Sequence, residues 1–595
     1  MSPQTHAINR PIAAVRRARV WYILVLFIIG VFLVRLFYLQ IIRHDYYQKS
    51  ALLGHLKEYE IPADRGLIKA HNGDGEGVVP IALNQTLYTI YVDPQIIKEH
   101  GKVAETLAAT LGQGAASSYE SKLRTKDTRY VVIARKVPED QKKAILAKKY
   151  PGVGAQEQSY RTYPNGALAS QLLGFVNDEG KGLYGIEQAL NAELAGTPGQ
   201  LKAVTDVHGV PLAANTDNIL KQPKRGQDVV LNVNVAMQRQ VETILKQGLD
   251  RAQSESGSAV VFNPKNGAVL AMANWPSYDP AKFAEVDNGE LFTNPSVSSP
   301  LEVGSVMKPL TAAAALDKGV VEPDSSYYDP SSYEIDEFRV KNIEEDGGPG
   351  TKNITDILNL SLNTGATWLL MKMGGSNDTV NRQGREVWHD YMTEHFMFGK
   401  ETGIEQGYEA AGSVPDPIKG YARSLTYANS SFGQAMTATP LQMAAAFSAA
   451  VNGGTYYQPQ LVDYTVDAAG TKHDKEPVVI KRDVVSKDVS DALRPMLEYV
   501  VDDHYFKRKF DQNTYSVGGK TGTAQIASPD GGYLANDYNG TYIGFVGGDE
   551  AQYVISVRVN KPKIKGYAGS AAAQPLFGDI AHMILDNFSV TPKQR

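Results

Sequence analysis

One apolar segment near the N-terminus limits how the whole chain can be arranged. Val20 to Val34 contains no charged residue, and Leu36 to Ile42 extends this run past a single charge at Arg35. As a helix, residues 20–42 would reach about 34 Å, which is enough to cross a bilayer with some tilt. Almost all of the remaining chain must therefore fold on one side of a membrane.

Basic residues predict which side that is. Four arginines precede the apolar run: Arg10, Arg16, Arg17 and Arg19. By the positive-inside rule, residues 1–19 form a cytoplasmic tail, residues 20–42 a single transmembrane helix, and everything after about His44 lies outside the cytoplasm. A cleaved signal peptide is the alternative, but Phe37 to Tyr47 is bulky and offers no small-residue cleavage site. Arg35 either snorkels to the outer interface or faces a partner helix.

Composition excludes several classes of function. The 595-residue chain has no cysteine, so disulfides, thiolate catalysis and zinc–thiolate sites are ruled out. A net charge of −5 and a pI near 6.2 give no basis for nucleic-acid binding. His389 and His395 lack the spacing of a metalloprotease pair and are interpreted as structural. We expect no metal and no cofactor.

Three short motifs follow one another in the second half: Ser305-Val306-Met307-Lys308, Ser361-Leu362-Asn363 and Lys520-Thr521-Gly522-Thr523. Residues three apart share a helix face, so Ser305 and Lys308 project together if Val303 to Lys318 is helical. A serine hydroxyl is a poor nucleophile without an adjacent base. Burial or a cationic neighbour such as Lys520 would lower the pKa of the Lys308 amine enough for it to take the serine proton.

The residues after Lys308 predict where the nucleophile lies. Pro309 to Leu316 is mostly small and apolar, which suits a buried central helix. Pro309 is tolerated only in the first turn of that helix, so Ser305 is expected at its N-terminus. The helix dipole at that end favours the oxyanion formed during acylation.

Each motif also has a simpler interpretation when taken alone. A Ser-x-x-Lys pair is commonly a solvated helix face, and Ser361 with Asn363 could be a helix cap. The Gly-Gly-Lys-Thr-Gly-Thr stretch could be a tight turn, whereas a phosphate loop fails for want of a glycine in the required frame. The order and context favour catalysis. The first motif opens an apolar helical run, the second sits in another helix-like segment, and the third follows a Gly-Gly turn before a β-rich tail.

The N-terminal half is expected to mix short strands and helices. Strands are predicted at Leu87 to Val92 and Tyr130 to Ala134, and helices at Val103 to Leu111 and Glu139 to Lys148. The polar stretch Thr216 to Gln227 is interpreted as a linker. We find no catalytic cluster in this half.

The C-terminal half begins and ends with predicted strands. Ser258 to Asn263 and Ala268 to Asn274 are joined by an Asn266-Gly267 hairpin turn, and Tyr553 to Val559 alternates as a late strand. Asn452 to Gly454 marks a loop. Strands first, helices in the middle and strands last predict an α+β fold in which helices cover an antiparallel sheet. Residues 374–398 are interpreted as a polar surface insertion of unknown role.

The three motifs together resemble the serine acyl-transfer signature of penicillin-binding proteins and serine β-lactamases. The first half carries stretches similar to the pedestal motifs of class B (monofunctional) penicillin-binding proteins, and of their division-type members in particular. These stretches are Arg65–Ile68, Asn72-Gly73, Ile81–Asn84, Arg161–Asn165, Gly174–Asn177 and Gly185–Glu187. The chain departs from the pattern by a Gly-rich insertion at Asp74 to Val79.

The resemblance implies an architecture and roles for the motif residues. It implies a pedestal over residues 43–227, a connecting segment over 228–256, a transpeptidase domain with a five-stranded sheet over 257–585, and a tail over 586–595. Ser305 would be the nucleophile and Lys308 its base, while Ser361 relays a proton and Asn363 orients the substrate. Lys520 and Thr521 would bind the substrate carboxylate within the Lys520–Thr523 motif, Gly522 included, and the N–H groups of Thr523 and Ser305 would form the oxyanion hole.

The implied activity is a membrane-anchored D,D-transpeptidase that cross-links peptidoglycan stem peptides, acts in septal wall synthesis and is inhibited by β-lactams. Its implied partners are a polytopic membrane glycosyltransferase and other division proteins. Three alternatives stay open: an elongation-type enzyme of the same class, a β-lactam sensor, and a division scaffold with vestigial acylation. The single span argues against a sensor, and the intact motifs argue against a scaffold alone. We find no clear Glu-x-x-x-Asn motif of the kind that would direct the acyl group to water.

Overall fold

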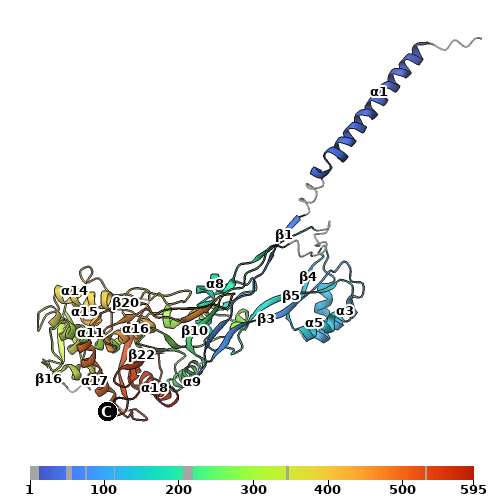
Figure 1. Cartoon of the computed structure of the whole chain (residues 1–595). Helices are drawn as coiled ribbons and strands as arrows, with labels where there is room; N and C mark the ends of the chain where they lie inside the picture. Colours follow the sequence, from blue (N-terminus) through green and yellow to red (C-terminus); the bar gives the residue numbers. More distant parts are fainter. Residues whose placement is uncertain are drawn as a thin grey trace, which may run out of the picture. The chain divides into compact units, whose positions relative to one another are not determined.

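The computed structural model describes residues 12–47, 56–73, 77–112, 114–126, 128–204, 219–343, 348–504, 506–528 and 532–594. The chain separates into two compact units (Figure 1). The first comprises residues 1–63 and 197–224, and the second comprises residues 64–196 and 225–595. Arg10 and residues 74–76 of the Gly-rich insertion lie outside the described residues.

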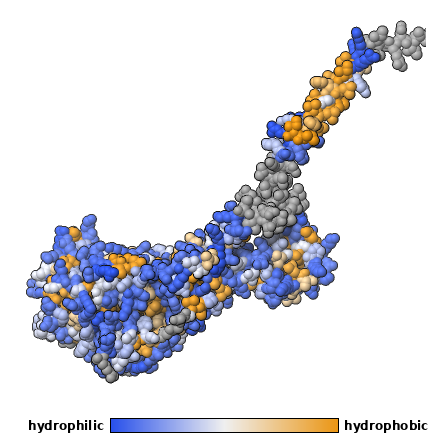
Figure 2. Space-filling view, viewed as in Figure 1, coloured by the Kyte–Doolittle hydropathy of each residue, from blue (hydrophilic) through white to orange (hydrophobic). Residues whose placement is uncertain are grey.

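The first unit carries the predicted membrane segment. α1 (Ile12–Phe37) continues into a single π-helical turn, η1 (Tyr38–Ile42). Within the described ranges, Arg16–Ile42 is the one stretch that is helical, long and apolar enough to span a bilayer, and its apolar surface is orange in Figure 2. The Arg35 guanidinium lies 5.6 Å from the centre of the Tyr38 ring, which leaves both interpretations of Arg35 open.

A three-stranded antiparallel sheet completes the first unit. Its order is β1 (Leu56–Ile61), β8 (Gly199–Val204) and β9 (Ile219–Lys221). β9 falls inside residues 216–227, where we expected a linker, and Lys224 exchanges backbone hydrogen bonds with Thr197 beyond it. The boundary between the two units falls after Lys224, inside the expected linker, but residues 219–221 and Lys224 are paired with β8 and Thr197; residues 216–218 lie outside the described residues.

The second unit begins with a seven-stranded sheet built from both halves of the chain. Its strands are β2 (Ile68–His71), β3 (Val78–Val92), β4 (Val131–Val137), β5 (Val153–Thr162), β10 (Asp228–Asn234), β18 (Val462–Val466) and β19 (Lys472–Asp474). The order is β19-β18-β10-β2-β3-β4, and β5 also pairs with β3. The strands predicted at residues 87–92 and 130–134 are confirmed within β3 and β4.

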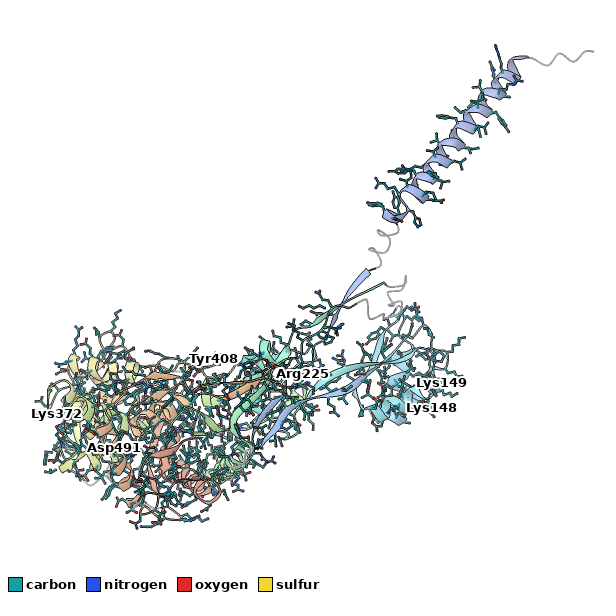
Figure 3. The ribbon with its side chains drawn as sticks, in the orientation of Figure 1. Lys148, Lys149, Arg225, Lys372, Tyr408 and Asp491 are labelled. Carbon is teal, nitrogen blue, oxygen red and sulfur yellow. The ribbon has the colours of Figure 1, made fainter. Side chains whose placement is uncertain are left out.

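Three helices pack against β3, β4 and β5: α3 (His100–Leu111), α4 (Ala116–Leu123) and α5 (Glu139–Leu146). Their shared core includes Ile90, Leu107 and Ile133, each at most 5% exposed. Lys148 and Lys149 follow α5 and are labelled in Figure 3. Both helices predicted in this half are confirmed, because their apolar spacing matches the faces that are buried.

A buried ion cluster ties several pedestal motifs together. The carboxylate of Glu187 is 0% exposed and accepts hydrogen bonds from Arg65 Nε at 2.8 Å and Arg161 Nε at 2.6 Å. Arg65 also donates to Asn191, and Arg161 donates to Asn84 and the Gly66 carbonyl. The Glu187 carboxylate thus binds two guanidinium groups. These ion pairs link the stretches around Arg65, Arg161 and Glu187, which are far apart in sequence.

The C-terminal half is built on a five-stranded antiparallel sheet, as predicted. The strands are β11 (Ser256–Phe262), β12 (Val269–Trp275), β21 (Ser516–Ala527), β22 (Tyr533–Gly547) and β23 (Ala551–Asn560). Their order is β12-β11-β23-β22-β21, so β21 lies at an edge. The predicted strands around residues 258–274 and 553–559 are confirmed.

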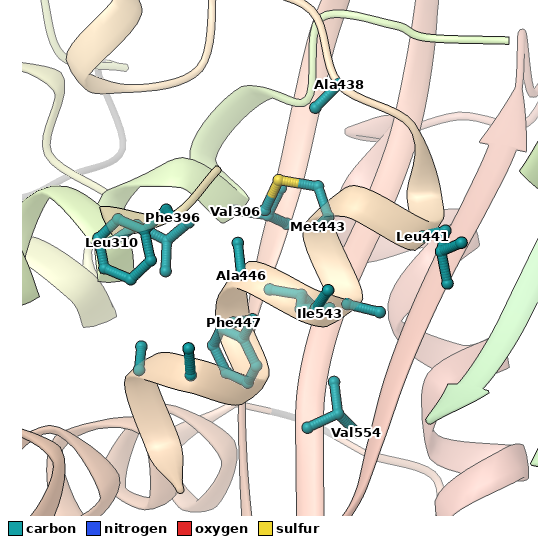
Figure 4. Close-up of a cluster of buried hydrophobic side chains, with 14 of the residues drawn as sticks. Val306, Leu310, Phe396, Ala438, Leu441, Met443, Ala446, Phe447, Ile543 and Val554 are labelled. Atoms are coloured by element: carbon teal, nitrogen blue, oxygen red, sulfur yellow. The ribbon is translucent and has the colours of Figure 1, made fainter. Parts of the chain in front are cut away.

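Helices cover both faces of this sheet. Alternate residues of β11 point to opposite faces, so Val261 packs with α9 (Val235–Ala252) and α18 (Gln574–Asn587), while Val260 faces the other side. There α16 (Pro440–Val451) lies on the sheet, with Met443 and Phe447 beside Ile543 and Val554 (Figure 4). Val306 and Leu310, from the nucleophile region, border the same core (Figure 4). The α+β sandwich is confirmed.

The expected connecting segment at residues 228–256 and the expected tail at residues 586–595 both contribute to this fold. Residues 228–252 form β10 and α9, and Met237, Leu245 and Leu249 of α9 are buried against the sheet. At the C-terminus, the backbone of Thr591 hydrogen bonds to the Gln552 side chain, and Lys593 N donates to the Thr514 carbonyl. Apolar side chains hold α9 against the sheet, and hydrogen bonds hold residues 591–593 beside it.

The expectation of a surface insertion at residues 374–398 is wrong. This stretch forms α14 (Arg382–Asp390) and the π-helical turn η6 (Tyr391–His395). Trp388 and Phe398 are fully buried in the main core. The segment looked polar because α14 presents its charged residues to solvent, while its large apolar side chains are few and widely spaced. His389 contacts Tyr427 and His395 contacts the Val484 carbonyl, consistent with structural roles.

Candidate active site

The nucleophile region begins with a tight turn. η5 (Gly304–Met307) is a 3₁₀ turn that runs directly into α11 (Lys308–Asp317). Pro309 sits in the first turn of α11, as predicted, so the missing N–H costs no helix bond. The continuous helix expected from residue 303 is therefore a 3₁₀ turn followed by an α-helix, with Ser305 at the start.

Lys308 is the centre of the site. Its side chain is 0% exposed, and Nζ lies 2.9 Å from Ser305 Oγ, 3.0 Å from Ser361 Oγ and 2.9 Å from Asn363 Oδ1. It also contacts the Ser361 carbonyl oxygen. Three residues from two separate motifs, Ser305, Ser361 and Asn363, thus converge on one amine. An amine in hydrogen-bond contact with the serine hydroxyl is placed to exchange a proton with it.

The second motif occupies a turn between two helices, not a helix. α12 (Ile354–Asn359) ends before Ser361, and α13 (Asn363–Met373) begins after Leu362. Ser361 has a φ of +57°, and this left-handed conformation lets both its carbonyl and its hydroxyl face Lys308. Such a residue typically costs about 1–3 kcal/mol and persists only where its surroundings hold it.

Neither Ser361 nor Asn363 acts as a helix cap. Leu362 occupies the cap position of α13, and no side-chain cap bond forms there. The Asn363 amide group donates to the Lys341 carbonyl at 3.0 Å, which directs Oδ1 toward Lys308. The next residue is braced by a buried network in which Thr364 Oγ1 donates to Asp329, 2.8 Å away. The hydrogen bonds of Asn363 and Thr364 thus hold the turn with Asn363 Oδ1 directed toward Lys308.

The third motif lies on β21, at the edge of the sheet. The Gly518-Gly519 pair is part of this strand and not a turn, because both residues pair with β22. Lys520 is 1% exposed, and its Nζ lies 3.2 Å from Thr521 Oγ1. Thr523 Oγ1 accepts a hydrogen bond from Gly569 N at 2.9 Å. Thr521 and Thr523 are half-buried on one side of the strand, while Lys520 and Gly522 are buried on the other.

Close backbone packing holds the nucleophile turn against β21. Gly304 has a φ of +68°, and a Cβ placed on it would lie 2.8 Å from the Thr523 carbonyl oxygen and 3.1 Å from the Thr523 nitrogen. Thr541 of β22 donates from Oγ1 to the Val303 carbonyl at 2.7 Å. The residue before the nucleophile therefore touches the residue whose N–H is the candidate oxyanion donor, and only glycine fits there.

Sequence reasoning missed several residues that support the site. Thr311, one turn after Lys308, accepts a hydrogen bond from Trp388 Nε1 at 3.0 Å and donates to the Ser431 carbonyl at 2.8 Å. Glu302, three residues before Ser305, binds two other segments through one oxygen. No short motif marks these residues. The one signal for Glu302 was its acidic side chain in an otherwise apolar stretch, three residues before Ser305.

Comparisons with known proteins place the site within matched domains. The model of the penicillin binding protein transpeptidase domain matches residues 257–582, and that of the penicillin-binding protein dimerisation domain matches residues 60–231. The chain belongs to the class B penicillin-binding proteins. All three motifs fall within the transpeptidase match, and the Arg65–Glu187–Arg161 cluster falls within the dimerisation match.

Relatives cover nearly the whole chain. Stage V sporulation protein D of Bacillus subtilis is 32% identical over 97% of this chain and 87% of its own length. Penicillin-binding protein PbpB of Mycobacterium tuberculosis is 32% identical over 93% of this chain and 82% of its own. Peptidoglycan D,D-transpeptidase FtsI of Escherichia coli is 27% identical over 94% and 89%. The similarity to each of these relatives thus extends over more than nine-tenths of this class B chain.

Solved structures support the same fold. Penicillin-binding protein 2X of Streptococcus thermophilus superposes with a TM-score of 0.72 at 24% identity, covering 89% of this chain and 80% of that one. Penicillin-binding protein 3 of Mycobacterium tuberculosis, complexed with aztreonam, gives a TM-score of 0.65 at 25% identity over 90% of this chain and 100% of its own. The resemblance expected from the motifs is thus confirmed for both domains.

Proposed function

We propose that this class B penicillin-binding protein cross-links peptidoglycan stem peptides through an acyl-enzyme on Ser305. The observation that carries the proposal is the 2.9 Å separation of Lys308 Nζ and Ser305 Oγ. Lys308 is fully buried as the first residue of α11, Ser305 is half-buried in the turn before it, and both lie inside the matched transpeptidase domain. A nucleophile in hydrogen-bond contact with a base that a third group orients is the arrangement required for covalent catalysis.

In acylation, the neutral amine of Lys308 takes the Ser305 proton as Oγ bonds to the donor carbonyl carbon. The peptide C–N bond then breaks, and the leaving amine receives a proton through the Ser361 hydroxyl, which lies 3.0 Å from Lys308 Nζ. In the second half-reaction an acceptor amine attacks the ester carbonyl carbon and passes a proton through the Ser361 hydroxyl to Lys308 Nζ. The ester bond between the acyl carbon and Ser305 Oγ breaks, and Lys308 returns the proton to Oγ.

Substrate binding falls to β21. Lys520 and Thr521 supply a cation and a hydroxyl for the terminal carboxylate of the donor. Among the described strands, β21 pairs only with β22, so an extended peptide can add to its outer edge. The N–H groups of Ser305 and Thr523 stabilise the oxyanion, a role supported by the contact between Gly304 and the Thr523 backbone. β-Lactams enter as acylating analogues of the donor.

The cellular setting is inferred from the resemblance to division-type members. We place the protein in septal wall synthesis, anchored in the cytoplasmic membrane with its N-terminus inside and residues after 44 outside. Its partners are a polytopic membrane glycosyltransferase and other division proteins, which would contact α1 and the pedestal. The pedestal acts as a spacer and docking surface, and not as a second enzyme.

A product analysis tests the reaction. Purified protein is incubated with a stem-peptide donor, with and without an amine acceptor, and the products are weighed by mass spectrometry. A cross-linked product that needs the acceptor supports transpeptidation. A hydrolysed donor alone indicates a carboxypeptidase, and a stable acyl-enzyme without turnover indicates a sensor or scaffold. Depletion in cells distinguishes the two transpeptidase roles, because filaments with blocked septa indicate division and rounded cells indicate elongation.

A further inference from the structure

Glu302 joins three segments beside the nucleophile. Its Oε1 accepts a hydrogen bond from the backbone N–H of Ala435 at 2.9 Å and another from the hydroxyl of Tyr533 at 3.0 Å. Ala435 follows α15 (Arg423–Ser431) in the helical part of the domain, and Tyr533 is the first residue of β22. One oxygen, three residues before Ser305, therefore connects the helical part to the hairpin formed by β21 and β22.

The second carboxylate oxygen has a different environment. Among the described residues, Oε2 of Glu302 is buried and has no hydrogen-bond partner. Burial raises the pKa of Glu302, although the hydrogen bonds from Ala435 and Tyr533 oppose that rise. An unpaired buried carboxylate oxygen is unfavourable, and proteins generally retain such a group for a specific reason. Packing alone does not explain this side chain, since an apolar residue would fill the space at lower cost.

The contacts on either side of Glu302 show which segments it holds together. Leu301 and Ala438 exchange backbone hydrogen bonds, and Gly304 N donates to the Gly433 carbonyl at 2.9 Å. The helical side of the junction is thus fastened at three points, of which Glu302 supplies the middle one. On the sheet side, Tyr533 pairs with Ala527 at the far end of β21, four residues beyond Thr523.

We propose that Glu302 is a positioning residue that fixes the far end of the β21–β22 hairpin against the nucleophile turn. The inference rests on the proposed acyl transfer at Ser305. β21 is held near Ser305 at Thr523 by the Gly304 contact, and the Glu302–Tyr533 hydrogen bond adds a second fixed point farther along the strand. These two contacts fix the direction of β21. The strand edge and the Thr523 N–H therefore stay oriented toward the reacting carbonyl. Displacements of about 1 Å in such geometry can cost on the order of 100-fold in rate.

The test compares Tyr533→Phe with Tyr538→Phe in the full-length protein. Both tyrosines lie on β22 and are similarly exposed, at 38% and 36%, but only Tyr533 donates to Glu302. Stopped-flow labelling with a fluorescent penicillin separates the non-covalent dissociation constant from the acylation rate constant. We expect Tyr533→Phe to lower the acylation rate constant roughly 10-fold with less than a twofold change in the dissociation constant. Tyr538→Phe should match the wild type in both.

Three further variants separate positioning from general stability. Glu302→Gln retains an acceptor oxygen and should recover most of the activity that Glu302→Ala loses. In the Glu302→Ala background, adding Tyr533→Phe should have no further effect, because both changes remove the same hydrogen bond. The proposal would be overturned if Tyr533→Phe acylated as fast as the wild type. It would also be overturned if Tyr533→Phe slowed acylation as much in the Glu302→Ala background as it does alone. Failure of the wild type to become labelled would instead refute acylation at Ser305.

Discussion

Nζ of Lys308, the first residue of α11, lies 2.9 Å from Oγ of Ser305 in the turn before it. We predict that a fluorescent penicillin labels the wild-type protein covalently and that Ser305→Ala takes no label. Removal of one hydroxyl from the turn leaves the surrounding backbone contacts in place, so the variant should unfold at the same temperature as the wild type. Labelling that survives in folded Ser305→Ala protein would falsify the assignment of the nucleophile.

The two lysines should fail in different ways. Lys308→Ala should reduce the acylation rate constant by about 10²–10⁴-fold, since it removes the proton acceptor. Lys520→Ala should mainly weaken capture of a carboxylate-bearing β-lactam, by roughly 10–100-fold, while slower acylation persists at saturating drug. Rapid-mixing labelling over a range of drug concentrations separates the two constants.

The contrast between these variants is the informative result. Equal and mild losses for both lysines at saturating drug would contradict the roles assigned to them. Lys372→Ala serves as a control in the same domain, because this lysine (labelled in Figure 3) is on the last turn of α13 and its side chain donates a hydrogen bond to Asn377 instead of to any of the three motifs. It should leave both constants unchanged.

Two glycines with the same backbone conformation separate strain from contact. Gly304 and Gly319 both have a φ of +68°, but a Cβ at Gly319 would meet nothing within 4 Å, whereas one at Gly304 would meet Thr523. Gly319→Ala should cost about 1–2 kcal/mol of unfolding free energy through its conformation alone and keep normal labelling. Gly304→Ala should in addition lose most of its acylation rate, because β21 must move away from Ser305.

Denaturant unfolding and penicillin labelling, measured on the same preparations, check this pair. If Gly304→Ala labels as fast as Gly319→Ala, the contact between the nucleophile turn and Thr523 does not matter for acylation.

The pedestal cluster should determine stability and not chemistry. Glu187→Ala leaves two buried guanidinium groups without their carboxylate, and loss of one member of a buried ion network typically costs about 3–5 kcal/mol. We therefore expect a lower denaturant midpoint, while labelling per folded molecule stays normal. Glu193→Ala is the matched control, because Glu193 is nearby in sequence but exposed. An unchanged midpoint for Glu187→Ala would show that the cluster contributes little.

Short-range patterns predicted much of this molecule. The Ser-x-x-Lys spacing and Pro309 together anticipated a nucleophile at a helix start, and alternation along residues 258–274 anticipated the sheet. Ser361 could not be placed the same way, because its left-handed turn is held by Lys308 and Lys341, which are distant in sequence. Trp388 was misjudged for a related reason. The burial of this one aromatic residue in a charged helix depends on its hydrogen-bond partner Thr311, which is 77 residues away and so outside any local pattern.

The junction at Glu302 was beyond sequence reasoning as well. Its partners Ala435 and Tyr533 lie 133 and 231 residues away, and each uses a group that any local analysis would pass over: a backbone N–H and one tyrosine hydroxyl among many. Motifs identify the reacting residues because chemistry fixes their types. The groups that orient those residues are fixed only by the fold.

The last prediction concerns the membrane anchor. A protein that begins after residue 45 lacks the span Arg16–Ile42 but keeps β1. Among the described strands, β1 covers one edge of β8 and β9 covers the other. The truncated protein should therefore be soluble and bind penicillin, yet fail to support division in cells because it no longer reaches the membrane. A cut after residue 62 removes β1 as well and exposes the β8 edge, so this second protein should aggregate more readily.

Orientation is tested in the intact protein by reporters fused after Arg595. The three described arginines at the start of the span, Arg16, Arg17 and Arg19, predict that the N-terminus stays in the cytoplasm. A reporter that is active only outside the cytoplasm should then give signal, and a cytoplasm-only reporter should stay silent. The opposite pattern would put Ser305 on the face of the membrane where no cell wall exists, and the proposed wall-synthesis role would fail together with the orientation.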